Sequence, residues 1–260
     1  MTIDPANFHL RVEGIGPRTF VLFNGAGQSL HTWDLVVPAF LDRGKVIRFD
    51  VPGVGQSPAP DEPYSFEELG DAVLELTRPH RSGPMIVVGH AWGARAAQVL
   101  ARDHPSQVAG VVIGSNGARF PPLATEDELK VLFDPAAADG GTWAQRFEQV
   151  YCAPDFAERE PERSQWLFQL VRSTPRDPAL VGAAVARTPP EAYLGRFGCP
   201  ALLLYGAEDR IGHRRNAEDL HRQCPKSKLV YVQDAGHFVI AEQPERFAEE
   251  VLIWVEEAGL

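Results

Sequence analysis

The stretch Gly89-His90-Ala91-Trp92-Gly93 decides the fold of this chain. An apolar run, 85–88, precedes it, and a helix-like run follows from 94 to 102. A strand, a tight turn flanked by glycines and a helix are the setting of a nucleophile elbow, Gly-x-Ser-x-Gly. The central residue of that turn is the nucleophile, and here it is Ala91, whose methyl group cannot attack a carbonyl carbon. The sequence therefore predicts a site that lacks its usual reactive atom.

Strand-like and helix-like runs alternate on both sides of this turn. Apolar runs predict strands at 8–12, 19–23, 45–49, 108–113, 200–205 and 229–232. Helix patterns lie at 31–41, 66–77, 216–223 and 244–257. Ser65 and Glu68 form a capping-box pattern before the second of these helices. The alternation predicts an α/β fold: a mostly parallel central sheet with helices on both faces.

The strand rhythm stops between residues 118 and 196. Helical spacing there predicts short helices at 126–133, 142–151, 162–172 and 178–187. We interpret this block as a helical lid inserted after the sixth strand, above the strand ends where such sheets bind ligands. The predicted domains are a core formed by 1–117 and 197–260 and a cap formed by 118–196.

Two further chemical groups follow strands in the order that a catalytic triad requires on this type of fold. Asp209 follows the strand at 200–205, and His237 follows the strand at 229–232. Asp209 would accept a hydrogen bond from His237 and fix its tautomer, with Glu208 as the alternative acid. His237 would be the general base. Ala91 marks the nucleophile position of this catalytic set.

Two loops provide the predicted oxyanion hole and part of the substrate site. The backbone N–H groups of Ala26 and Trp92 would hold the developing negative charge. Asn24 begins the first of these loops. Aromatic residues of the lid and of the histidine loop would line a largely apolar pocket. The predicted substrate-binding residues are Asn24, Trp143, Phe147, Trp166 and Phe238.

Composition limits the other functions. The formal net charge of −10 argues against nucleic acid and anionic membranes as partners. Three scattered cysteines and eight histidines without ligand spacing predict neither a disulfide framework nor a metal site, and we expect no cofactor. The first residues carry no signal-peptide pattern, and no apolar run is long enough for a membrane helix. We expect a cytoplasmic monomer or homodimer that binds a small molecule.

These residues carry a family resemblance. Over nearly its whole length the chain resembles the α/β-hydrolase superfamily, which implies an ester-type substrate. The segments 23–25, 49–55 and 63–66 resemble intracellular medium-chain polyhydroxyalkanoate depolymerases, which have Ser-Trp-Gly-Gly where this chain has Ala-Trp-Gly-Ala at 91–94. The elbow itself is similar to that of aminoacrylate hydrolases, which also have alanine there.

Three interpretations of Ala91 stay open at this point. In the first, the chain is an engineered Ser-to-Ala form of an enzyme that hydrolyses a carboxylic ester, lactone or thioester. In the second, the alanine is native, and His237 activates water or removes a proton directly, as a hydrolase or lyase. In the third, the chain is a non-catalytic ligand-binding protein on a hydrolase scaffold.

Overall fold

A computed structural model describes residues 3–116 and 140–260, with side chains in the second range from residue 144. Its centre is one seven-stranded sheet in the order β1-β3-β2-β4-β5-β6-β7. Only β1 pairs antiparallel, with β3, and every other neighbouring pair is parallel. This confirms the predicted mostly parallel α/β fold. The strands are β1 Leu10–Glu13, β2 Arg18–Phe23, β3 Gly44–Phe49, β4 Met85–His90, β5 Val108–Gly114, β6 Ala201–Gly206 and β7 Ser227–Val232.

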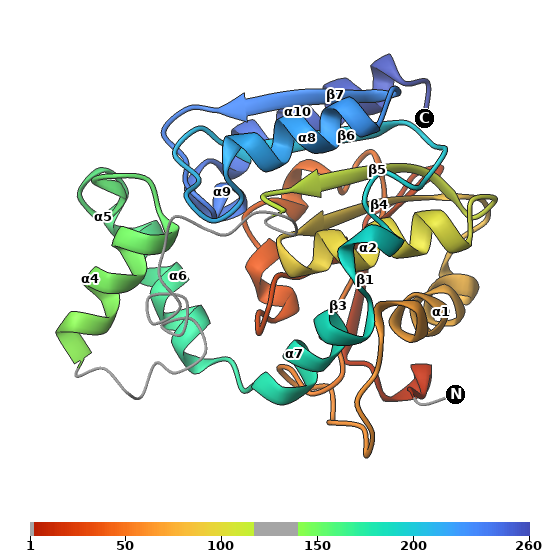
Figure 1. The fold of residues 1–260 in the computed structure, drawn as a ribbon, viewed down its shortest axis with the longest axis horizontal. Helices are drawn as coiled ribbons and strands as arrows, with labels where there is room; N and C mark the ends of the chain where they lie inside the picture. The colour runs from red at the N-terminus through yellow and green to blue at the C-terminus, as the bar shows by residue number, and fades with distance from the viewer. Residues whose placement is uncertain (1–2, 117–139) are drawn as a thin grey trace.

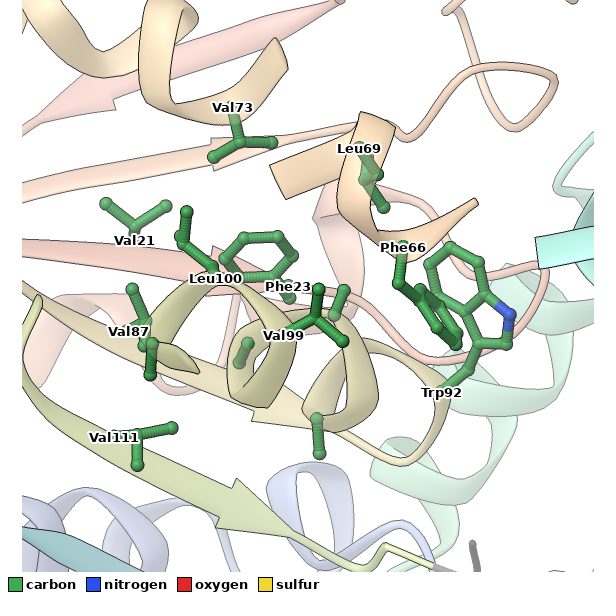
Figure 2. Packing of buried hydrophobic residues seen from close by; sticks show 14 of the residues in the cluster. Val21, Phe23, Phe66, Leu69, Val73, Val87, Trp92, Val99, Leu100 and Val111 are labelled. Carbon is green, nitrogen blue, oxygen red and sulfur yellow. The ribbon is translucent and has the colours of Figure 1, made fainter. Parts of the chain in front are cut away.

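Alternate side chains of each central strand enter two different apolar clusters, one on each face of the sheet. On β2, Phe23 belongs to one cluster and Leu22 to the other. A strand that is buried on both faces reads as a continuous apolar run, because neither face is free for polar side chains. Figure 2 shows the first cluster, to which Phe66, Val87 and Val99 all contribute.

Helices cover both faces of the sheet (Figure 1). The first face carries α1, α2 and α8, and the second carries α10 with the short elements η2, η3 and α9. The capping box predicted at Ser65 and Glu68 is present at the start of α1. The bounds are η1 Pro5–Asn7, η2 Leu30–Trp33, η3 Val37–Ala39, α1 Phe66–Thr77, η4 Arg78–His80, α2 Trp92–Asp103, α8 Arg214–Gln223, α9 Val239–Glu242 and α10 Pro244–Glu257.

The described part of the segment between β5 and β6 is helical and forms the cap. Its described elements are α4 Gly140–Tyr151, α5 Phe156–Arg159, α6 Pro161–Ser173, α7 Pro178–Arg187 and η5 Pro190–Ala192. In Figure 1 the arrowheads of β5 and β7 point toward the side where α4, α5 and α6 lie. The cap therefore lies beyond the carboxyl ends of the strands. The helix predicted at 126–133 lies outside the described residues.

Two predictions about the elements need correction. The insertion follows the fifth strand and not the sixth, because β1 to β5 precede it and β6 is the first described strand after it. The helix predicted at 31–41 is instead two 3-10 turns, η2 and η3. Pro38 lies in that segment, and proline lacks the N–H that a continuous α-helix would use there. Among the described helices, none is long and apolar enough to cross a membrane.

Candidate active site

The backbone at Ala91 has the strained geometry of an elbow. Its φ is 50° and its ψ is −111°, a conformation that costs free energy for any residue with a Cβ. A Cβ on Gly93 would lie 2.3 Å from the main-chain oxygens of Asn24 and Phe23. A Cβ on Gly89 would lie 2.5 Å from Cα of Ala94. Both glycines are therefore required by close backbone approach, as the motif predicts.

His237 and Asp209 lie in direct contact in the buried interior. Nδ1 of His237 is 3.1 Å from Oδ1 and 3.2 Å from Oδ2 of Asp209. The two side chains are 6% and 2% exposed. The N–H groups of Ile211 and Gly212 also donate to Asp209 Oδ1, at 2.9 and 2.7 Å. The carboxylate is therefore fixed by its own loop and oriented toward the imidazole.

The surroundings keep Asp209 ionised. Burial opposes its charge, but the charge and hydrogen bond of His237 and the N–H of Gly212 outweigh this, so that the pKa of Asp209 lies below its ordinary value. The ionised carboxylate of Asp209 can accept a hydrogen bond from the Nδ1–H of His237. That tautomer leaves Nε2 as the basic nitrogen, and Nε2 makes no hydrogen bond with the described residues.

His90 connects the elbow to the histidine loop. Its Nε2 lies 2.7 Å from the main-chain oxygen of His237, and the two imidazole rings have centroids 5.2 Å apart. Burial and the neighbouring charge of His237 lower the pKa of His90 to about 3. His90 is therefore neutral and donates through Nε2 to the main chain of His237. Because Ala91 is the next residue after His90, this hydrogen bond ties the histidine loop to the elbow. Because the partner is 147 positions away, the sequence carries no signal for this contact.

Two backbone N–H groups are available for an oxyanion. Among the described residues, neither the N–H of Ala26 nor that of Trp92 has an acceptor. The N–H of Ala91 is already used by the oxygen of Gly114, at 2.8 Å. Trp92 is the first residue of α2, and the positive end of the helix dipole there favours negative charge in front of it.

The side chain of Asn24 is engaged inside the fold. Its Nδ2 donates to the oxygen of Phe49 at 2.7 Å, and its Oδ1 accepts from the indole of Trp33 at 2.9 Å. The residue is fully buried. These contacts hold the loop after β2 against β3 and η2, and contact of Asn24 with substrate stays a prediction.

The predicted aromatic residues lie mainly in a cap cluster. Phe147 and Phe238 are fully buried with ring centroids 5.2 Å apart, and Trp166 packs at the edge of the same cluster. Ala26 also contacts this cluster, so its apolar surface reaches the loop that follows β2. The side chain of Trp143 lies outside the described part of the chain.

Within residues 3–116 and 140–260, no group of three or more metal-ligating side chains is found. The chemistry that this part of the chain can support is proton transfer by the buried His237–Asp209 pair.

Comparisons with known proteins agree with this arrangement. A model described as "Alpha/beta hydrolase family" matches residues 20–250. A pimeloyl-[acyl-carrier protein] methyl ester esterase of Neisseria meningitidis is 26% identical over 246 residues, covering 87% of this chain and 89% of the relative. A poly(3-hydroxyalkanoate) depolymerase of Ectopseudomonas oleovorans is 26% identical over 243 residues, covering 91% and 84%. This match confirms the resemblance inferred from residues 23–66.

A solved structure shows the same fold. A thermophilic esterase from Thermogutta terrifontis superposes with a TM-score of 0.83 and 25% identity, covering 96% of this chain and 93% of the other. The similarity of the alanine elbow to aminoacrylate hydrolases stays a prediction. The family model spans nearly the whole sheet together with its cap, so the chain belongs to the alpha/beta hydrolase family and is a hydrolase.

Proposed function

We propose that this chain hydrolyses a small, largely apolar carboxylic ester, lactone or thioester, with His237 as general base. The observation that carries the proposal is the buried His237–Asp209 pair, 3.1 Å apart, which His90 fastens to the elbow. The printed names of several relatives, among them the Neisseria esterase, describe ester hydrolysis. The apolar cap cluster that reaches Ala26 supports an apolar acyl group.

With Ala91 in place, the route that the chain's own atoms allow is direct attack by water. Nε2 of His237 takes a proton from the water, and the hydroxide oxygen adds to the carbonyl carbon. The N–H groups of Ala26 and Trp92 hold the resulting oxyanion. When the C–O bond of an ester or lactone, or the C–S bond of a thioester, breaks, the imidazolium returns its proton to the departing alkoxide or thiolate. Asp209 stabilises the imidazolium between these two proton transfers.

The second candidate is a serine hydrolase in which Ala91 stands in place of the nucleophile. The observation that favours it is the strained φ of 50° at Ala91, which is kept although a methyl group gains nothing from that conformation. With serine at this position, Oγ would lose its proton to His237 and form an acyl-enzyme, which water would then hydrolyse.

One experiment separates these routes. We would assay the unchanged chain, Ala91→Ser, His237→Ala and the double variant on short and long p-nitrophenyl esters and on lactones. Turnover by the Ser form alone, with a burst and an acyl mass increment at position 91, supports the serine route. Turnover by the unchanged chain that disappears in His237→Ala supports water attack. Tight ligand binding without turnover in any form would instead support a ligand-binding protein and overturn the proposal.

A further inference from the structure

Glu242 is a buried carboxylate that the proposed mechanism does not use. It ends α9, five residues after His237, and is 1% exposed. Among the described residues, the carboxylate of Glu242 has no Lys or Arg partner. Arg163 donates to the main-chain oxygen of Glu242, at 3.0 Å, and not to its carboxylate. Burying a charge without an opposite charge is costly unless hydrogen bonds compensate for the lost water.

Three backbone N–H groups supply part of that compensation. Glu242 Oε2 accepts from Ala153 at 2.7 Å and from Gly236 at 3.0 Å, and Oε1 accepts from Phe238 at 3.0 Å. Gly236 and Phe238 are the two chain neighbours of His237. Ala153 belongs to the cap, just beyond the end of α4. One carboxylate therefore joins both sides of the histidine loop to the cap.

Two further contacts complete the attachment of this loop. The N–H of His237 donates to the oxygen of Tyr151 in α4 at 2.7 Å, and the oxygen of His237 accepts from His90. The cap backbone also lies directly against Gly236, where a Cβ would come within 2.5 Å of the carbonyl carbon of Cys152. Gly236 has no side chain to separate the two segments, so main chain lies against main chain at this point.

We propose that Glu242 is a positioning residue that fastens the cap to the His237 loop and thereby aligns the imidazole with Asp209 and the elbow. The proposal rests on the proposed function, in which His237 is the base. Without the carboxylate, the N–H groups of Ala153, Gly236 and Phe238 lose their acceptor in a buried place. The loop then shifts to hydrate them, and the imidazole leaves its alignment. A displacement of about 1 Å at a catalytic group can lower a rate by about 100-fold.

Amide hydrogen exchange tests the attachment without any need for activity. Glu242→Gln keeps the size of the side chain but presents an NH₂ group to at least one backbone donor. Glu245→Gln is the matched control, because Glu245 lies three residues later with its side chain 77% exposed. We expect the amides of Ala153, Gly236 and Phe238 to exchange at least about tenfold faster in Glu242→Gln, with β4 unchanged and Glu245→Gln like the unchanged chain.

Spectroscopy and kinetics test the positioning. We expect the NMR resonance of the His237 Nδ1 proton, bonded to Asp209, to broaden or move in Glu242→Gln. We expect kcat to fall by at least about tenfold while KM changes by less than about threefold, because Glu242 acts through the His237 loop and not on the substrate itself. Should Glu242→Gln fail to fold, Ala153→Pro removes the cap donor alone and is measured in the same ways.

The outcomes are distinct. Exchange in Glu242→Gln at the rates of the unchanged chain overturns the attachment. Lost protection with an unchanged Nδ1 resonance and unchanged kcat shows a merely structural residue and overturns the positioning role. If no form of the chain turns over an ester although protection is lost and the resonance moves, the proposed ester hydrolysis fails while the positioning of His237 by Glu242 stands.

Discussion

The elbow and the histidine loop lie at the carboxyl ends of different strands, and they are built in different ways. At the elbow, backbone packs on backbone around Gly89 and Gly93. At the histidine loop, buried side chains of Asp209, His90 and Glu242 hold the main chain and the ring. The comparison shows that neither construction depends on an oxygen at position 91. The site can therefore keep its geometry with a methyl group there.

The largest effect should come from the histidine loop. If His237 is the base, His237→Ala should lower kcat/KM by about 10³-fold, about 4 kcal/mol of transition-state stabilisation. Asp209→Ala should cost less, about 10²-fold, because the acid orients the base without touching the substrate. Steady-state kinetics on the ester found in the assays above measures both, with exposed His221→Ala as control. A larger loss in the Asp209 variant would reverse the assigned roles.

The elbow should respond in stability and not only in rate. Gly93→Ala places a Cβ against main-chain oxygens that cannot rotate away, so we expect the free energy of unfolding to fall by about 3 kcal/mol. Gly182→Ala in α7 is the control, because its Cβ meets nothing within 4 Å. That variant should be neutral or more stable by up to about 1 kcal/mol. Urea unfolding measures both, and equal midpoints would contradict the packing argument.

The stability of the histidine loop should depend on pH, whereas that of the elbow should not. The ionisable side chain of Glu242 holds the histidine loop and does not contact the elbow. Burial, reinforced by the charge of Asp209, raises the pKa of Glu242 to about 7, from 4.5. The folded chain thus binds this proton more tightly than the unfolded chain does. Its contribution to stability is fully present below about pH 4.5 and is lost as the pH rises through about 7.

The unfolding free energy of the unchanged chain, relative to Glu242→Gln, should therefore decrease by up to about 3 kcal/mol between those pH values. Denaturant titrations at a series of pH values measure this difference, and exposed Glu245→Gln should give a flat one. A difference that grows with rising pH would mean that the carboxyl is already ionised in the folded chain at low pH.

The smallest effect concerns the link between the elbow and the cap. The indole of Trp92 donates to the oxygen of Val181 in α7 at 3.0 Å and packs on Phe66. Trp92→Phe keeps most of the packing shown in Figure 2 and removes the donor. We expect thermal unfolding to report a loss of about 1 kcal/mol, with the backbone N–H at this position unaffected. A loss of several kcal/mol would indicate that the indole anchors α7 to the elbow.

Much of the site could be predicted from the sequence because its parts are local. Ala91, Asp209 and His237 each lie in the loop that follows a strand, and their order along the chain is enough to bring them to one edge of a parallel sheet. The capping box at Ser65 and the helix that begins at Pro244 were also predictable, because their signals lie within one helical turn.

Other features depend on partners that are distant in the chain. The side-chain amide of Asn24 is engaged by Phe49 and Trp33, and no local pattern around Asn24 indicates these contacts. The helix predicted at 31–41 became two 3-10 turns around Pro38, which local apolar spacing did not reveal.

The sequence by itself determined the parallel sheet, the tight turn at Ala91 and the absence of a hydroxyl there, because periodicity, glycine spacing and residue identity are properties of short segments. Only the tertiary structure decided that His90 and Glu242 hold the two sides of the His237 loop, since their acceptor and donors come from strands, cap and loop at once. Burial then shifts the pKa values of His90 and Glu242, and burial depends on segments that are distant in the chain.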